Sequence, residues 1–169
     1  MEGMTIRDIE SVRVSFSEMP AALARGDVDA YVGAEPGPGN SLFSGVGKIV
    51  EYPYSTPMGS LNMIMATHRE TIDQKPDLAR VVLSLQKQGS QYAMSHPDEM
   101  VAMAVAKLGM KREAVDLSVK NVELNWKMTP EMIAAGKTYA EHMLELKQIR
   151  ALPDFSTFFD TKISDQLSA

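Results

Sequence analysis

Prolines and glycines punctuate residues 20–39 and constrain the fold more than any other stretch of the chain. Pro20 stands where the first turn of a helix tolerates its missing N–H group. Gly26 stands where a helix ends on a left-handed residue, a conformation that glycine adopts without strain. Residues suited to a buried strand follow at Val28, Ala30 and Val32. The composition of residues 34–41 then favours a loop, followed by a short helix over 40–44.

The helix that ends at Gly26 lies between two predicted strands. Residues 12–16 alternate apolar and polar side chains, which is typical of a half-buried strand. A strand–helix–strand unit of this size makes its strands parallel, with a right-handed crossover. A further strand is predicted over 48–52. The sequence therefore predicts an α/β fold with a small, mostly parallel sheet that includes strands near 11–16, 28–33 and 61–67.

A helical carboxyl-terminal portion is predicted after Thr67, because the spacing of apolar residues changes there from two to 3.6. Pro76 and Pro130 suit first helical positions, and Thr129 suits the cap that precedes the second of them. At least four helices are expected in this portion. The segments are 68–75, 76–92, 95–108, 111–121, 130–149 and 160–167.

Charge and composition exclude several classes of function. The 169-residue chain has a net charge of −5, which gives a nucleic-acid-binding role no electrostatic basis. It contains no cysteine, so disulfides, thiolate metal sites and cysteine nucleophiles are excluded. The three histidines, His68, His96 and His142, have no second ligand at metal spacing. We therefore expect no metal, no cofactor and no nucleic-acid partner. No signal peptide and no membrane-spanning apolar run is visible.

Polar side chains gather in the sequence around the loop at 34–41 and the segment 55–62. In an open α/β sheet, ligands bind at the carboxyl ends of the strands, and a few polar groups there orient a small ligand. Glu35 suits an amine or another hydrogen-donating group, although an acid in a surface loop is an equally good interpretation. The candidate ligand-binding residues are Tyr31, Glu35, Asn40, Ser55, Thr56 and Asn62.

Residues 21–36, which read AALARGDVDAYVGAEP, resemble the second-lobe signature of periplasmic solute-binding proteins of ABC transporters. The similarity is to the nitrate, taurine, alkanesulfonate and thiamine-pyrimidine-precursor type. The apolar strand at 61–67, the Pro-x-Leu helix start at Pro76 and the SHPDEM motif at 95–100 fit the same pattern. The resemblance covers most of residues 11–150 and corresponds to the carboxyl-terminal half of family members.

This resemblance implies a lobe of the type II periplasmic-binding-protein fold. Residues 1–60 would form the α/β part of the second lobe. Residues 61–169 would supply the crossing strand and the helices that pack on the first lobe. The chain would be the substrate-binding component of an importer, or a carboxyl-terminal fragment of it. It would hold a small polar organic solute in the cleft between lobes and deliver it to a membrane permease, in the periplasm or outside the cell.

Two other classes of function are an enzyme on the same scaffold and a ligand-sensing effector module. Thiamine-pyrimidine synthases and a desulfinase share the scaffold, but they depend on cysteines, which this chain lacks; we therefore expect no enzymatic activity. A ligand-sensing effector module of a transcription regulator would need a DNA-binding partner segment, and no basic segment is present. The solute itself does not follow from the sequence, although Glu35 slightly favours a cationic or hydrogen-donating ligand over a sulfonate or nitrate.

The resemblance also implies that the helices of residues 76–150 lack the sheet on which they pack in the family. An apolar patch of more than a few hundred Å² is rarely left bare. We therefore expect homo-oligomers through unpaired helical faces, and weak or absent solute binding by this chain alone. The apolar residues concerned are Leu78, Val82, Leu85, Met103, Met143 and Leu146.

Overall fold

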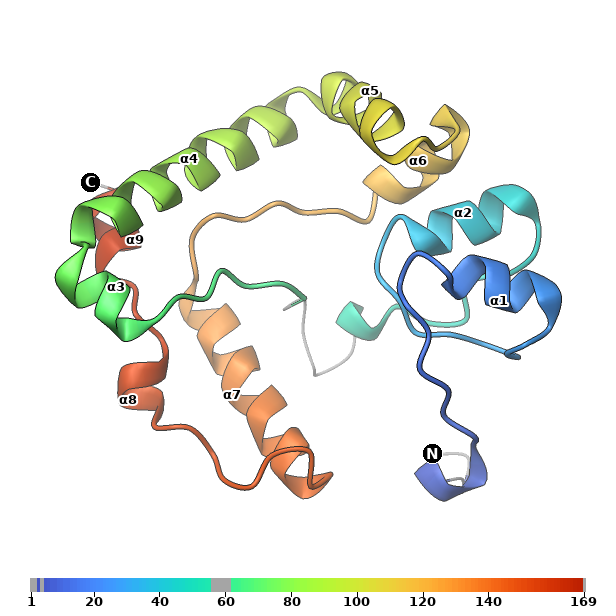
Figure 1. Ribbon diagram of the computed structural model, residues 1–169, viewed down its shortest axis with the longest axis horizontal. Helices are drawn as coiled ribbons and strands as arrows, with labels where there is room; N and C mark the ends of the chain where they lie inside the picture. Colours follow the sequence, from blue (N-terminus) through green and yellow to red (C-terminus); the bar gives the residue numbers. More distant parts are fainter. Residues whose placement is uncertain (1–2, 4, 56–61, 169) are drawn as a thin grey trace. The chain divides into compact units, whose positions relative to one another are not determined.

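The computed structural model describes residues 3, 5–55 and 62–168, and its regular elements are helices (Figure 1). Two short 3₁₀ helices cover Ile6–Asp8 (η1) and Pro53–Ser55 (η2). The α-helices are α1 Met19–Arg25, α2 Gly37–Ser44, α3 Arg69–Gln74, α4 Pro76–Ser95, α5 Pro97–Leu108, α6 Arg112–Val119, α7 Pro130–Glu145, α8 Phe155–Phe158 and α9 Lys162–Gln166.

The predicted α/β fold with a parallel sheet is wrong, because the described residues contain no strand. Segments 11–16, 28–33, 48–52 and 62–67 form no sheet, and no described backbone hydrogen bond joins 11–16 to 28–33. A strand is stabilised by hydrogen bonds to a neighbouring strand, which alternation of side chains alone does not supply. Val32 and Met63, expected in a sheet, are 81% and 86% exposed.

Local signals at helix ends are confirmed. Gly26 ends α1 with a left-handed φ of 75°, and the Thr129 hydroxyl caps α7 by accepting a hydrogen bond from the Met132 N–H group. The loop expected over 34–41 is wrong in its second half, because α2 already begins at Gly37. Pro36 directly precedes α2, and Pro38 lies in its first turn. A helix needs no N–H donor from a residue at these positions.

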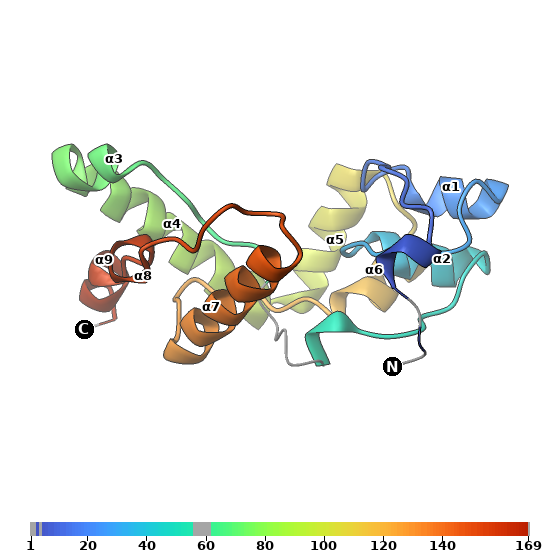
Figure 2. The ribbon, with the colours of Figure 1, turned by 90° about the horizontal axis from the view of Figure 1, so that it is seen from below.

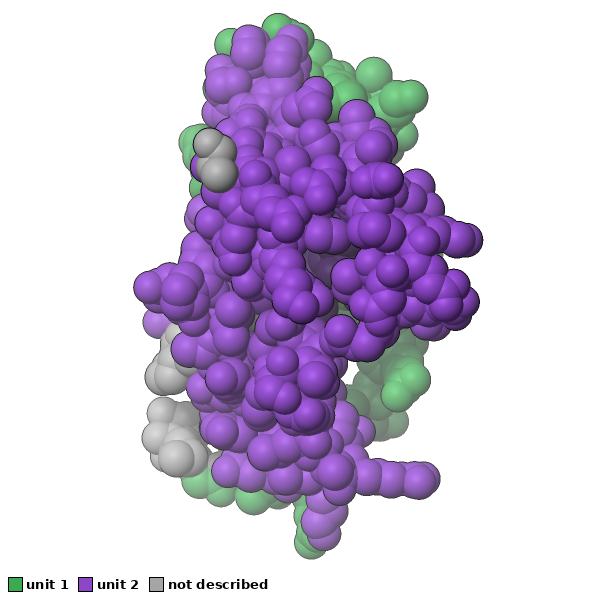
Figure 3. Space-filling view, turned by 90° about the vertical axis from the view of Figure 1, so that its left-hand side faces the viewer, with its two compact units in different colours: residues 1–50, 97–122 green, residues 51–96, 123–169 purple. Residues whose placement is uncertain are grey.

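The chain divides into two compact units, which Figure 3 distinguishes by colour. Unit 1 consists of residues 1–50 and 97–122, and unit 2 of residues 51–96 and 123–169. Both units are therefore built from two separate stretches of sequence. The assignment of residues 1–60 to the second lobe and of residues 61–169 to the part that packs on the first lobe stays a prediction. The described residues include no helix long and apolar enough to cross a membrane.

Unit 1 is organised by α6, against which α2 and α5 pack, with α1 on α2 (Figure 1, Figure 2). Its buried side chains are small. They are Pro20, Ala22, Ser41, Val101, Ala114, Val115 and Ser118. Small side chains allow helix backbones to approach closely, so this core is stabilised by many short-range contacts rather than by a few bulky residues.

The closest approach of α2 to α6 is at Gly39, which is buried. A Cβ atom at this position would lie 2.8 Å from the Ala114 carbonyl oxygen and would also clash with the Ser118 hydroxyl. The Ser118 hydroxyl is held in place because it donates a 3.0 Å hydrogen bond to that same carbonyl. Residue 39 must therefore lack a side chain for the two helices to pack as they do.

Unit 2 is built on α4, which contacts α3 at its start and α9 along one side. The Lys87 ammonium group donates a 2.6 Å hydrogen bond to the Leu167 carbonyl and lies 4.8 Å from the centre of the Trp126 ring. The Met94 sulfur accepts a hydrogen bond from the Leu124 N–H group. These contacts, with buried Ser90 and Ala93, fix one side of α4.

We predict that Gly39→Ala destabilises the protein by about 1–3 kcal/mol, the usual cost of overpacking a close contact. Gly89→Ala is the matched control, because Gly89 lies inside α4 with nothing within 4 Å of an added Cβ atom. It should stabilise the protein by up to about 1 kcal/mol through helix propensity. Urea unfolding followed by circular dichroism measures both changes, and a Gly39→Ala variant at least as stable as the wild type would contradict the packing described.

Candidate functional site

The loop that enters α2 is organised by the Glu35 carboxylate, which is half-buried. One of its oxygens accepts a 3.0 Å hydrogen bond from the Gly39 N–H group. The other accepts a 2.8 Å hydrogen bond from the side-chain amide of Asn121, which follows α6. The carboxylate thus satisfies a free N–H group in the first turn of α2, where the helix dipole favours negative charge, and connects that turn to the end of α6.

These hydrogen bonds give Glu35 a structural role inside unit 1. Each carboxylate oxygen of Glu35 can still accept a second hydrogen bond. These contacts therefore leave room for an amine, and amine binding by Glu35 stays a prediction. Its negative charge also remains beside the half-exposed loop. The signal for the structural role was not visible in the sequence, since Asn121 lies 86 residues further along the chain.

Tyr31 and Asn40 flank Glu35 in the sequence and belong to unit 1. The Tyr31 and Ser41 hydroxyl groups are 2.7 Å apart and share a hydrogen bond. The Asn40 backbone is used by α2, because its carbonyl accepts a 2.7 Å hydrogen bond from the Ser44 hydroxyl. Within the described part of the chain, the Asn40 side-chain amide has no hydrogen-bond partner. This half-buried amide is therefore available to a ligand.

The other candidate residues belong to unit 2 or lie outside the described residues. The Ser55 hydroxyl donates hydrogen bonds to the Glu51 carboxylate at 3.0 Å and to the Tyr52 carbonyl at 2.7 Å, so it is engaged in its own turn. Asn62 is exposed, and Thr56 lies outside the described residues. Tyr31, Glu35 and Asn40 all belong to unit 1, and a cleft common to the six residues stays a prediction.

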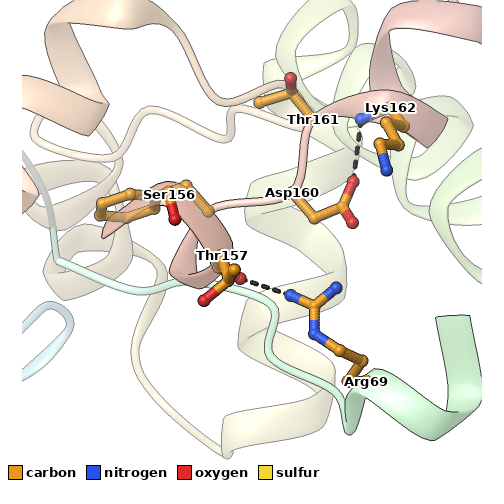
Figure 4. A pocket seen from close by; sticks show the side chains of 7 residues that line it. Arg69, Ser156, Thr157, Asp160, Thr161 and Lys162 are labelled. Carbon is orange, nitrogen blue, oxygen red and sulfur yellow. Dashed lines mark hydrogen bonds between the residues drawn. The ribbon is translucent and has the colours of Figure 1, made fainter. Parts of the chain in front are cut away.

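Sequence reasoning missed a shallow pocket of about 260 Å³ in unit 2, between α3, α8 and the start of α9 (Figure 4). The Arg69 guanidinium group donates a hydrogen bond to the Thr157 carbonyl. The Asp160 carboxylate accepts a 3.1 Å hydrogen bond from the Lys162 N–H group. No periodic pattern predicts this pocket, because Arg69 and Thr157 are 88 residues apart.

The pocket carries two cations and one carboxylate, and all three side chains are at least partly exposed. Next to it, hydrogen bonds from the Ser156 hydroxyl and N–H groups lower the pKa of Asp154, the residue that caps α8. Asp154 is fully exposed, so this shift reflects local capping. Solvent exposure weakens the electrostatic attraction that the pocket could offer a charged ligand, so we assign it no ligand.

We predict that Glu35→Ala destabilises unit 1 by about 1–2 kcal/mol, because two hydrogen bonds are lost. Glu35→Gln should cost less than half as much. Its carbonyl oxygen can still accept from Gly39, and the Asn121 amide can turn to accept from the new NH₂ group. Urea unfolding of the two variants tests this difference. Equal losses in both would show that these contacts do not hold the loop.

Comparison with known proteins gives a family for this sequence. A family model described as NMT1/THI5 like matches residues 1–100, which is more than half of the 169-residue chain and includes residues 31–41. Comparison with curated proteins and with solved structures gave no match. The chain belongs to the NMT1/THI5-like family, which is of the solute-binding type.

Proposed function

We propose that this chain acts as the substrate-binding part of an ABC-type importer and contacts a small polar organic solute through residues 31–41, which comprise the loop before α2 and the start of α2. The observation that carries the proposal is the family match over residues 1–100, which contains all of these residues. Supporting it, this segment carries the half-buried Asn40 amide and the half-buried Tyr31 side chain, whose hydroxyl group is hydrogen-bonded to that of buried Ser41.

The chemistry of the loop favours a solute that both donates and accepts hydrogen bonds. The Asn40 amide offers one acceptor and two donors. The Tyr31 hydroxyl group shares a hydrogen bond with that of buried Ser41 and can still make one more hydrogen bond. Because Glu35 is already bonded to Gly39 and Asn121, its contribution is chiefly a negative potential. That potential favours an uncharged or cationic solute over a sulfonate or nitrate.

Other parts of the proposal follow from the family. Solute-binding proteins of importers work with a membrane permease, in the periplasm or outside the cell, and catalyse no reaction. The full sequence has no cysteine, which speaks against the cysteine-dependent enzymes that share the scaffold. In a two-lobed binding protein both lobes close on the solute by hinge motion. Residues 31–41 alone therefore supply only part of the contacts, and their affinity for the solute should be weak.

We predict weak, millimolar binding of at least one amine or pyrimidine by this chain, measured by saturation-transfer NMR against a panel that includes sulfonates. Asn40→Ala and Tyr31→Phe should reduce the transfer signal several-fold, because each removes a polar group from the loop. Asn125→Ala is the matched control, since the Asn125 amide bonds only locally, to the Glu123 carboxylate at 3.1 Å. No signal for any solute, or equal signals in all variants, would contradict a role for this loop.

A further inference from the structure

The two oxygens of the Glu35 carboxylate are held in different ways. Oε2 accepts a 3.0 Å hydrogen bond from the backbone N–H group of Gly39, which is buried in the first turn of α2. Oε1 accepts a 2.8 Å hydrogen bond from the side-chain amide of Asn121, an exposed residue in the turn that follows α6. A backbone donor within a helix stays in place, whereas an exposed side chain changes rotamer within nanoseconds. The bond to Asn121 is therefore the one that a ligand can replace.

Among the described residues, neutral groups alone hold this carboxylate. The Gly39 N–H group and the Asn121 amide are both uncharged, and no ion pair in that part of the chain includes Glu35. The first turn of α2 adds a partial positive charge through the helix dipole, but not a full countercharge. A carboxylate binds a cationic donor more strongly than a neutral one. A cation that carries N–H groups therefore suits Oε1 better than the Asn121 amide does.

We propose that Asn121 competes with the solute for Glu35, so that the site admits an organic ammonium compound and rejects solutes that cannot displace the amide. The ammonium group of the solute replaces the Asn121 amide at Oε1, while the bond from Gly39 to Oε2 is kept. The displaced amide then forms its hydrogen bonds with water. Competition of this kind rests on the proposed function, because it concerns a residue of the same 31–41 segment, and it narrows the solute to one chemical class.

The specificity follows from the free energy that displacement of Asn121 costs. A neutral solute exchanges one hydrogen bond from a neutral donor for another of the same kind, so it gains little. A sulfonate or a nitrate has no N–H donor and is repelled by the carboxylate charge. A quaternary ammonium ion carries the charge but no N–H group. An ammonium group supplies both, so Asn121 selects for this class and is a specificity-determining residue of the site.

The first test follows the side-chain NH₂ signals of Asn121 in NMR spectra of the isotope-labelled full chain, where Asn121→Ala identifies these signals by their loss. The two probes are benzylammonium and benzyltrimethylammonium, which share the ring and a single positive charge at neutral pH. Only benzylammonium can donate N–H hydrogen bonds. At millimolar concentration it should shift the Asn121 signals toward those of a hydrated amide, and the same concentration of benzyltrimethylammonium should leave them unchanged.

The second test measures affinity by titration, with the Gly39 N–H signal as the readout. Asn121→Ala should bind benzylammonium about threefold to tenfold more tightly than the wild type, because one hydrogen bond of ordinary strength no longer opposes binding. Its affinity for benzyltrimethylammonium should not change. Asn125→Ala is the matched control, since the Asn125 amide also donates to a glutamate carboxylate, that of Glu123 at 3.1 Å; this variant should bind both probes like the wild type.

Three outcomes would overturn the competition. They are Asn121 signals that do not move with benzylammonium, equal shifts with both probes, and an affinity of Asn121→Ala for benzylammonium that is unchanged or weaker. A weaker affinity would show that Asn121 only positions Glu35. Failure of the proposed function gives a different result: no solute of the panel produces a transfer signal, while benzylammonium still displaces Asn121. The role in solute uptake would then be wrong, and the competition at Glu35 would stand.

Discussion

Unit 1 depends on a contact between α2 and α6 that is possible only because residue 39 has no side chain. Gly39 lies against the Ala114 carbonyl and the Ser118 hydroxyl, with no space for a Cβ atom. The same residue donates its N–H group to Glu35, whose other oxygen accepts from Asn121 beyond α6. One glycine therefore sets both the distance between the helices and the conformation of the loop that leads into α2.

Large apolar side chains behave differently from the small ones of this core. None of the bulky residues among those described is fully buried, whereas Val50 and Met63 are 87% and 86% exposed. The segments that carry these residues have strand-like sequences, but none of them pairs with a strand among the residues that the structure describes. Apolar surface of this kind costs free energy in water, so the chain presents surfaces that favour association.

How much could be predicted from the sequence depended on whether the determining contacts are local. The ends of α1 and α7 were predicted because Gly26 and Thr129 act on their own helices. The sheet was predicted wrongly because a strand is decided by non-local pairing, which side-chain alternation does not guarantee. The start of α2 was predicted three residues too late, because prolines, which usually end regular structure, also suit the first turn of a helix. The bonds from Glu35 to Asn121 and from Arg69 to Thr157 join residues more than 80 positions apart, and no sequence pattern indicates either.

Amide hydrogen exchange at Gly39, followed by NMR, tests most directly whether the α2–α6 contact holds unit 1 together. The Gly39 N–H group is buried and bonded to the Glu35 carboxylate, so the account predicts that it exchanges as slowly as the amides of Ala114 and Val115 in α6. Groups that open only when a cooperative unit opens share one protection level. Exchange at Gly39 as fast as in an unstructured peptide, while Ala114 and Val115 stay protected, would contradict the account.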